Sequence, residues 1–299
     1  MNYVFHLLIY FGIYAILAMG LNLVVGYCGL LTLAHAGYFA VGAYAYALGT
    51  LAWGLDSISA LLLAFAAGGV LSLLTSLPTW RLKGDYFVMA SMAVQVLIYS
   101  TAYNWVNSEA ALGTISNLTN GPFGIAGITR PVLFGVKLTS LGAMAAYSLV
   151  LAGICLGVCR LLQSAAWGRT LKCMRDDELA AKNLGKDVQC LKVQALCIAC
   201  ALAAVAGAIY ASYTSYIDPS LASMDQSILL LSMIFVGGMG NLGGPLAGAA
   251  ILLLIPEVLR FMNIPDAVAA EIRVMLYGLL LVLIVRFKPE GVAGDYKVN

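Results

Sequence analysis

Three polar residues inside long apolar runs are the first candidates for chemistry in this 299-residue chain. Asn22, His35 and Gln95 each lie within such a run. Burying a polar side chain in lipid is costly, so such residues face other helices or a water-filled path. A hydrogen bond between helices is their commoner use. We therefore consider Asn22, His35 and Gln95 candidate residues of a translocation path, with interhelical hydrogen bonding as the alternative.

The sequence contains no arrangement that indicates catalysis or metal binding. His6 and His35 are its only histidines, and no cysteine or carboxylate accompanies either at ligand spacing. Cys197 and Cys200 have the spacing of a redox or metal pair. They stand inside an apolar run, where small polarisable residues serve packing. We predict no catalytic residues, no metal site and no cofactor, so the chain is not expected to be an enzyme.

A charged stretch from about residue 163 to 190 contains a short helix with both ends marked. Asp176 is a suitable N-cap, and Asp177 and Glu178 fall in the first turn, where the helix dipole favours acids. Gly185 can take the left-handed conformation that ends a helix. About eight helical residues give a rod of roughly 12 Å. Such a helix suits docking in a groove of a partner; an ordinary solvated loop helix is the alternative.

The composition indicates a membrane protein. The chain is 62% hydrophobic and 10% charged, with a mean hydropathy of +0.93, whereas soluble domains carry about 25% charged residues. We predict one all-α integral membrane domain over residues 1–299, a polytopic helical bundle of about nine (eight to ten) transmembrane helices of about 20 residues each. One run, 31–52, is rich in glycine and alanine and could be broken or re-entrant. The apolar runs lie at about 4–26, 31–52, 58–78, 86–106, 139–162, 191–213, 226–241, 246–263 and 270–286.

Lysine and arginine are distributed unevenly among the loops. With the loop 79–85 in the cytoplasm and alternating spans, twelve of the 16 basic residues lie inside, which is a strong positive-inside bias. The C-terminus is then cytoplasmic, the loop at about 107–138 is outside, and the side of the N-terminus depends on the run 31–52. The net charge of +2 indicates no nucleic-acid partner. The inner residues are Arg81, Lys83, Arg160, Arg169, Lys172, Arg175, Lys182, Lys186, Lys192, Arg286, Lys288 and Lys297, and the outer ones are Arg130, Lys137, Arg260 and Arg273.

Six stretches, in order and covering nearly the whole chain, resemble the branched-chain amino acid family of ABC importer permeases, specifically its M-type subunit. The family commonly has serine and glycine where this chain has Thr32 and Ala34, and often glycine at Asn120. The stretches are Gly20 to Tyr44, Arg81 to Phe87, Leu118 to Gly124, Glu178-Leu-Ala-Ala181 with Gly185, Ala206 to Tyr210 with Ile217-Asp-Pro219, and Phe235 to Ala249.

The resemblance implies a multi-subunit transporter in the bacterial cytoplasmic (inner) membrane. Its partners would be a paralogous H-type permease, two ATP-binding subunits that hydrolyse ATP, and an external substrate-binding protein. The inner helix would be the coupling helix that sits in an ATPase groove. The residues expected to couple the chain to the ATPase are Arg175, Asp177, Glu178, Ala181 and Gly185.

Other functions stay open at this point. Permeases of the same family serve urea or short amides as well as leucine-type amino acids, and the external binding protein largely sets the selectivity. A self-contained secondary transporter would need intramembrane carboxylates to couple ions, and these runs contain almost none. A membrane-embedded enzyme would need a catalytic constellation.

Overall fold

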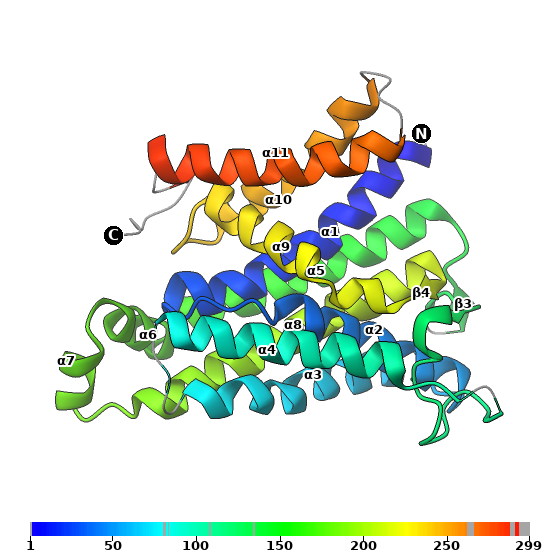
Figure 1. Cartoon of the computed structure of the whole chain (residues 1–299), viewed down its shortest axis with the longest axis horizontal. Helices are drawn as coiled ribbons and strands as arrows, with labels where there is room; N and C mark the ends of the chain where they lie inside the picture. The colour runs from blue at the N-terminus through cyan, green and yellow to red at the C-terminus, as the bar shows by residue number, and fades with distance from the viewer. Residues whose placement is uncertain are drawn as a thin grey trace.

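The computed structural model is a bundle of helices that run along one common direction (Figure 1). It describes residues 2–79, 82, 84–107, 109–133, 135–261, 266–287 and 291–292. Each of the predicted apolar runs contains a helix, which confirms the all-α polytopic fold. The helices are α1 (Asn2–Asn22), the π-helix η1 (Leu23–Tyr27), α2 (His35–Leu51), α3 (Ser57–Thr79), α4 (Asp85–Asn104), α5 (Leu141–Ser164), α6 (Ala166–Asp176), α7 (Glu178–Asn183), α8 (Val188–Thr214), α9 (Met224–Gly237), α10 (Gly243–Phe261) and α11 (Asp266–Phe287), with short 3-10 turns η2 (Gly121–Phe123) and η3 (Pro219–Ala222).

Five of these helical segments are long and apolar enough to cross a membrane. The shorter α9, with 14 residues, rises about 21 Å, less than the ~30 Å hydrocarbon thickness. Residues 215–223, between α8 and α9, contain only a short strand and a 3-10 turn. The five long segments are Tyr3–Tyr27, Ser57–Leu77, Asp85–Asn104, Leu141–Ser164 and Val188–Thr214.

The bundle has two distinct ends, which we name by their contents (Figure 1). The α7 end carries α6 and α7. The β end carries the four short strands, in which β1 (Ile125–Ala126) pairs with β4 (Tyr216–Ile217) and β2 (Val132–Leu133) pairs with β3 (Val136–Lys137). The chain therefore divides its non-membrane segments between opposite faces.

The basic residues of the two predicted loops lie at opposite ends, as the charge pattern predicts. Arg169, Lys172 and Lys182 belong to α6 and α7, whereas Lys137 belongs to β3 at the β end. The described C-terminal residues also lie at the α7 end, because Val292 donates its N–H to Val236 near the end of α9. Arg81, Lys83, Lys288 and Lys297 lie outside the described residues, as do the side chains of Arg260 and Arg273.

The run 31–52 is a broken segment that crosses the bundle. Residues 28–34 form no helix, and α2 begins only at His35. A Cβ added to Gly29 would lie 2.8 Å from the Arg175 Cγ of α6, so the break starts at the α7 end. The residue after α2, Ala52, packs against Gly113 in the outer loop at the β end. The run is thus not re-entrant, and it returns the chain to the end where α1 began.

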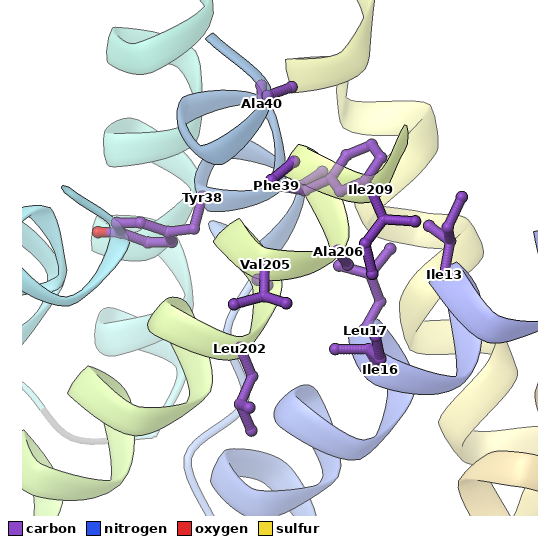
Figure 2. Packing of buried hydrophobic residues seen from close by; sticks show 14 of the residues in the cluster. Ile13, Ile16, Leu17, Tyr38, Phe39, Ala40, Leu202, Val205, Ala206 and Ile209 are labelled. Carbon is purple, nitrogen blue, oxygen red and sulfur yellow. The ribbon is translucent and has the colours of Figure 1, made fainter. Parts of the chain in front are cut away.

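The packing of α2 on α8 brings two helix backbones together. A Cβ added to Gly207 would lie 2.7 Å from the Ala43 amide nitrogen, closer than real Cβ contacts. Small residues allow helix backbones to approach this closely. In lipid, van der Waals packing drives helix association, because the hydrophobic effect does not act between helices there. Figure 2 shows the result: Phe39 of α2, Ile209 of α8 and Ile13 of α1 meet in the core around α8. This core fixes the broken segment in place.

Candidate functional site

The helix α7 is shorter than expected and begins one residue later. Asp176 is the last residue of α6, not an N-cap, and it lies 2.9 Å from the Arg175 guanidinium. The chain is extended at Asp177, whose carboxylate accepts from the N–H groups of Leu179 (2.9 Å) and Ala180 (3.0 Å). The prediction of Asp176 was wrong because α6 continues through it. The six residues of α7 span about 9 Å.

Two lysines hold Glu178 at the start of α7. Its Oε1 lies 3.1 Å from Lys182 one turn later, and its Oε2 lies 3.0 Å from Lys192 of α8. The Lys192 side chain is 5% exposed and that of Glu178 is 21% exposed. A buried ammonium needs a counter-charge, because removing one partner leaves an uncompensated charge. Glu178 therefore fixes α7 against α8.

Two exposed leucines that sequence reasoning missed lie at α7, Leu179 in its first turn and Leu184 directly after its last residue. Leu179 is 68% exposed and Leu184 is 77% exposed, whereas Ala181 is buried against the bundle. Gly185 has φ +73°, the left-handed conformation expected of the residue that ends this helix. Leucines in a charged, solvated loop are the signal that could have indicated this surface.

Arg175 points into the bundle. Its Nη1 donates to the carbonyl of Gly26 at 2.6 Å, and its side chain is 10% exposed. Gly26 is part of η1, so Arg175 satisfies a carbonyl at the end of the first membrane segment. A free helix carbonyl there would otherwise be unpaired. Of the predicted coupling residues, Arg175 and Ala181 face the bundle, Asp177 caps α7 and Glu178 anchors it.

Serine and threonine side chains satisfy the backbone of the break. The N–H of Leu33 donates to Ser91 Oγ at 3.0 Å, and its carbonyl accepts from Ser227 Oγ at 2.6 Å. Thr32 Oγ1 accepts from the N–H of Ala34 at 3.3 Å. Irregular backbone at membrane depth is tolerated only where its polar groups find partners in the protein. Ser91 of α4 and Ser227 of α9 supply those partners.

Gln95 joins two interrupted segments of the chain. One is the break at 28–34 that precedes α2, and the other is the stretch 215–223 that precedes α9. Its Oε1 accepts from the N–H of Gly37 in the first turn of α2 at 2.7 Å, and its Nε2 donates to the carbonyls of Ala222 (2.6 Å) and Ser223 (3.3 Å) before α9. Gln95 is 1% exposed. The beginnings of α2 and α9 therefore converge on one side chain midway along α4.

Replacement of Gln95 by leucine is expected to destabilise the protein by about 2–4 kcal/mol, because the three hydrogen bonds that its side chain makes to backbone groups are lost. The measurement is the thermal unfolding temperature of the purified protein in detergent. Thr101→Val is the matched control on the same helix, since Thr101 bonds only the Leu97 carbonyl within α4 in the described contacts. Equal unfolding temperatures for the Gln95→Leu variant and the wild type would contradict this account of the break.

Asn22 lies before the break and His35 directly after it, and both residues are buried. Asn22 Nδ2 donates to the carbonyl of Asn241 at 2.8 Å, and its Oδ1 accepts from the N–H of Gly240 at 3.3 Å. His35 is 2% exposed, and its Nε2 has no hydrogen-bond partner among the described residues. It lies beside Gly20, where an added Cβ would come within 3.4 Å of Nε2. Asn22, His35 and Gln95 thus border the same broken segment without sharing one pocket.

An apolar cavity of about 450 Å³ lies between α2, α3 and α4. Two threonines in its wall, Thr101 and Thr119, donate to backbone carbonyls. Among the described residues that line it, none is charged, and Asn22, His35 and Gln95 are not among them. Burying the charges of an amino acid without partners is costly, so this cavity suits an apolar group and not a zwitterion.

Within the described part of the chain, no group of three or more histidine, cysteine or acidic residues could hold a metal ion. The seven cysteines are free, and Cys200 is buried in the core. The geometry therefore offers a capped helix at the α7 end, a broken membrane segment, and a polar network that connects them.

A family model described as the permease component of branched-chain amino acid transport systems matches residues 3–285. The chain belongs to this permease family. It is thus a multi-pass membrane permease of an ABC importer, and the matched range contains every candidate residue described above.

Individual permeases of two types are similar to this chain over most of its length. The high-affinity branched-chain amino acid transport system permease protein LivM of Salmonella typhimurium is 30% identical over 93% of this chain and 67% of that protein. A probable LivM of Methanocaldococcus jannaschii is 26% identical over 95% of this chain and 91% of that protein. LivH of Salmonella typhimurium is 22% identical over 96% and 92%, which indicates a paralogous permease. No solved structure matches the chain significantly.

Proposed function

We propose that this chain is the M-type subunit that carries branched-chain or similar small amino acids into the cytoplasm, with α7 coupling it to two partner ATPases. The observation that carries the proposal is α7 itself. Asp177 caps it and Glu178 fixes it to α8, while Leu179 within it and Leu184 directly after it are exposed. A rigid helix that presents apolar side chains suits a groove in a partner.

The translocation path is proposed to follow the break in residues 28–34. Interrupted membrane helices line cavities and substrate sites in transporters. Two interrupted segments converge on Gln95, and the His35 Nε2 beside them lacks a partner among the described residues. Asn22, His35 and Gln95 are the residues we assign to this path.

The α7 end is proposed to face the cytoplasm and the β end the exterior of the inner membrane. The basic residues concentrated on α6 and α7 support this orientation. The C-terminus is then cytoplasmic, the external binding protein docks at the β end, and an H-type paralogue packs beside the bundle within the bilayer.

Replacement of Leu179 by aspartate is expected to weaken association with the ATPase about 30-fold, since a charge replaces an anchor of ~2 kcal/mol in the groove. The unfolding temperature should not change, because Leu179 is exposed. The measurement is co-purification of the ATPase with the tagged permease. Ile115→Asp at the β end is the control, as Ile115 is 88% exposed. Undiminished ATPase recovery with the Leu179→Asp variant would contradict docking through α7.

The cargo is tested on the external binding protein, which largely sets selectivity in such systems. Calorimetric titration with leucine, isoleucine, valine, urea and a short amide would identify it. Binding of the aliphatic amino acids supports the proposal. Binding of urea or a short amide alone would assign the permease to that alternative cargo.

A further inference from the structure

The end of the first membrane segment is held by α6 and the end of α5 through three side chains. Arg175 donates to the Gly26 carbonyl at 2.6 Å. The Lys172 ammonium lies 4.9 Å from the centroid of the Tyr27 ring, and the Tyr27 hydroxyl donates to Gln163 at 2.8 Å. A cation over an aromatic face is an attractive contact. The π-helix η1 therefore cannot shift without moving the helix that leads into α7.

The same π-helix is tied on its other side to the glycine turn between α9 and α10. Asn22, the residue before η1, bonds both Gly240 and Asn241. A Cβ added to Gly26 would lie 2.9 Å from the Gly240 nitrogen, so the two backbones are in direct contact. Asn22 is fully buried, and its two hydrogen bonds fix the turn to the start of η1.

A separate apolar cluster packs α6, α7 and η1 together with the first half of α8. Leu171 and Met174 of α6 and Ala181 of α7 pack with Leu23 and Tyr27 of η1. The larger core involves the second half of α8 and does not include these residues. Single π-turns are rare and are frequently found at functional sites. A unit that is packed in this way, and joined to the turn by the Asn22 amide and by the contact of Gly26 with Gly240, can pass on a displacement.

We propose that η1 transmits the movement of α6 and α7 to the glycine turn 238–242, with Asn22 and Tyr27 as positioning residues. This inference rests on the proposed function of α7. In this inference, residues 22–27 connect α6 and α7 to the turn 238–242. The Glu178–Lys192 contact with α8 does not make this connection. The turn lies between α9 and α10. Its displacement therefore changes the position of these two helices relative to residues 28–34.

The test is amide hydrogen exchange in the reconstituted transporter, compared with and without a non-hydrolysable ATP analogue. In the wild type, both segment 163–190 and the turn 238–242 should respond to the nucleotide. In the Asn22→Ala variant, segment 163–190 should respond as before, while the response of the turn should fall about tenfold as two buried hydrogen bonds are lost. The Tyr27→Phe variant, which loses one hydroxyl, should show a reduction of about threefold.

Ser148→Ala is the matched control, because Ser148 is buried and bonds the Ile9 carbonyl of α1 away from η1. It should leave both responses intact. A full response of the turn in the Asn22→Ala and Tyr27→Phe variants would overturn the inference while leaving the coupling function standing. If amide exchange in segment 163–190 of the wild type does not change with the nucleotide, the coupling function is overturned, and the inference with it.

Discussion

Replacement of Glu178 by lysine is expected to reduce ATP-driven uptake about a hundredfold, since the loss of a buried counter-charge costs about 3 kcal/mol or more. The substitution leaves Lys192, whose side chain is 5% exposed, beside a second ammonium where a carboxylate stood. The start of α7 then loses its anchor on α8. The transmembrane core does not involve Glu178, so the amount of protein in the membrane should stay near the wild-type level. ATP hydrolysis is expected to continue without coupled uptake.

The measurements are uptake, ATP hydrolysis and membrane content in the same vesicles. Exchanging the charges in the Glu178→Lys, Lys192→Glu double variant should restore a large part of the uptake, because the pair is re-formed with opposite signs. Lys186→Glu, at an exposed position in the same loop, is the control for a change of loop charge. Wild-type uptake with substrate-stimulated ATP hydrolysis in the Glu178→Lys variant would refute the role of α7.

Replacement of Gly207 by valine is expected to abolish stable folding of the bundle. Its added Cβ would lie 2.7 Å from the Ala43 nitrogen and 3.0 Å from the Phe39 carbonyl carbon of α2. Backbone atoms cannot move aside as a flexible side chain can, so we expect a cost at or above the roughly 1–3 kcal/mol typical of overpacking. The measurement is the fraction of monodisperse protein recovered after extraction, followed by thermal unfolding.

Gly153→Val in α5 is the matched control for this prediction. No atom lies within 4 Å of a Cβ added to Gly153. Both changes introduce the same side chain into a membrane helix, so their difference isolates the contact of α2 with α8. Similar recovery and similar unfolding temperatures of the two variants would show that this contact is not essential.

The long apolar runs are sufficient to locate the apolar helices of this fold, whereas α6 lies outside them and was not predicted. A helix stands in every predicted run, because each run is long enough to satisfy its backbone within itself in lipid. The run 31–52 is expected to be broken or re-entrant; the break lies at residues 28–34, whereas the glycine- and alanine-rich part forms the continuous helix α2. The N-cap prediction failed by one residue. Asp176 and Asp177 are equally suitable caps by residue type, and only the continuation of α6 decides between them.

The polar network could not be predicted, because its partners are remote in the chain. Arg175 and Gly26 are 149 residues apart, and Asn22 and Asn241 are 219 apart. No periodicity connects such positions; tertiary packing brings them together. The sequence marks Lys192 only as an inner positive charge, and its burial against Glu178 depends on how α7 folds back on α8. Sequence reasoning therefore found several residues of the network without finding their contacts.

The most direct test of the central claim is uptake of radiolabelled leucine into liposomes that contain this chain, its paralogous permease and the two ATPases. We predict uptake that requires both ATP inside and the external binding protein outside, and that is lost when either is omitted. Uptake by this chain alone, driven by an ion gradient without ATP, would contradict the account and indicate a self-contained secondary transporter.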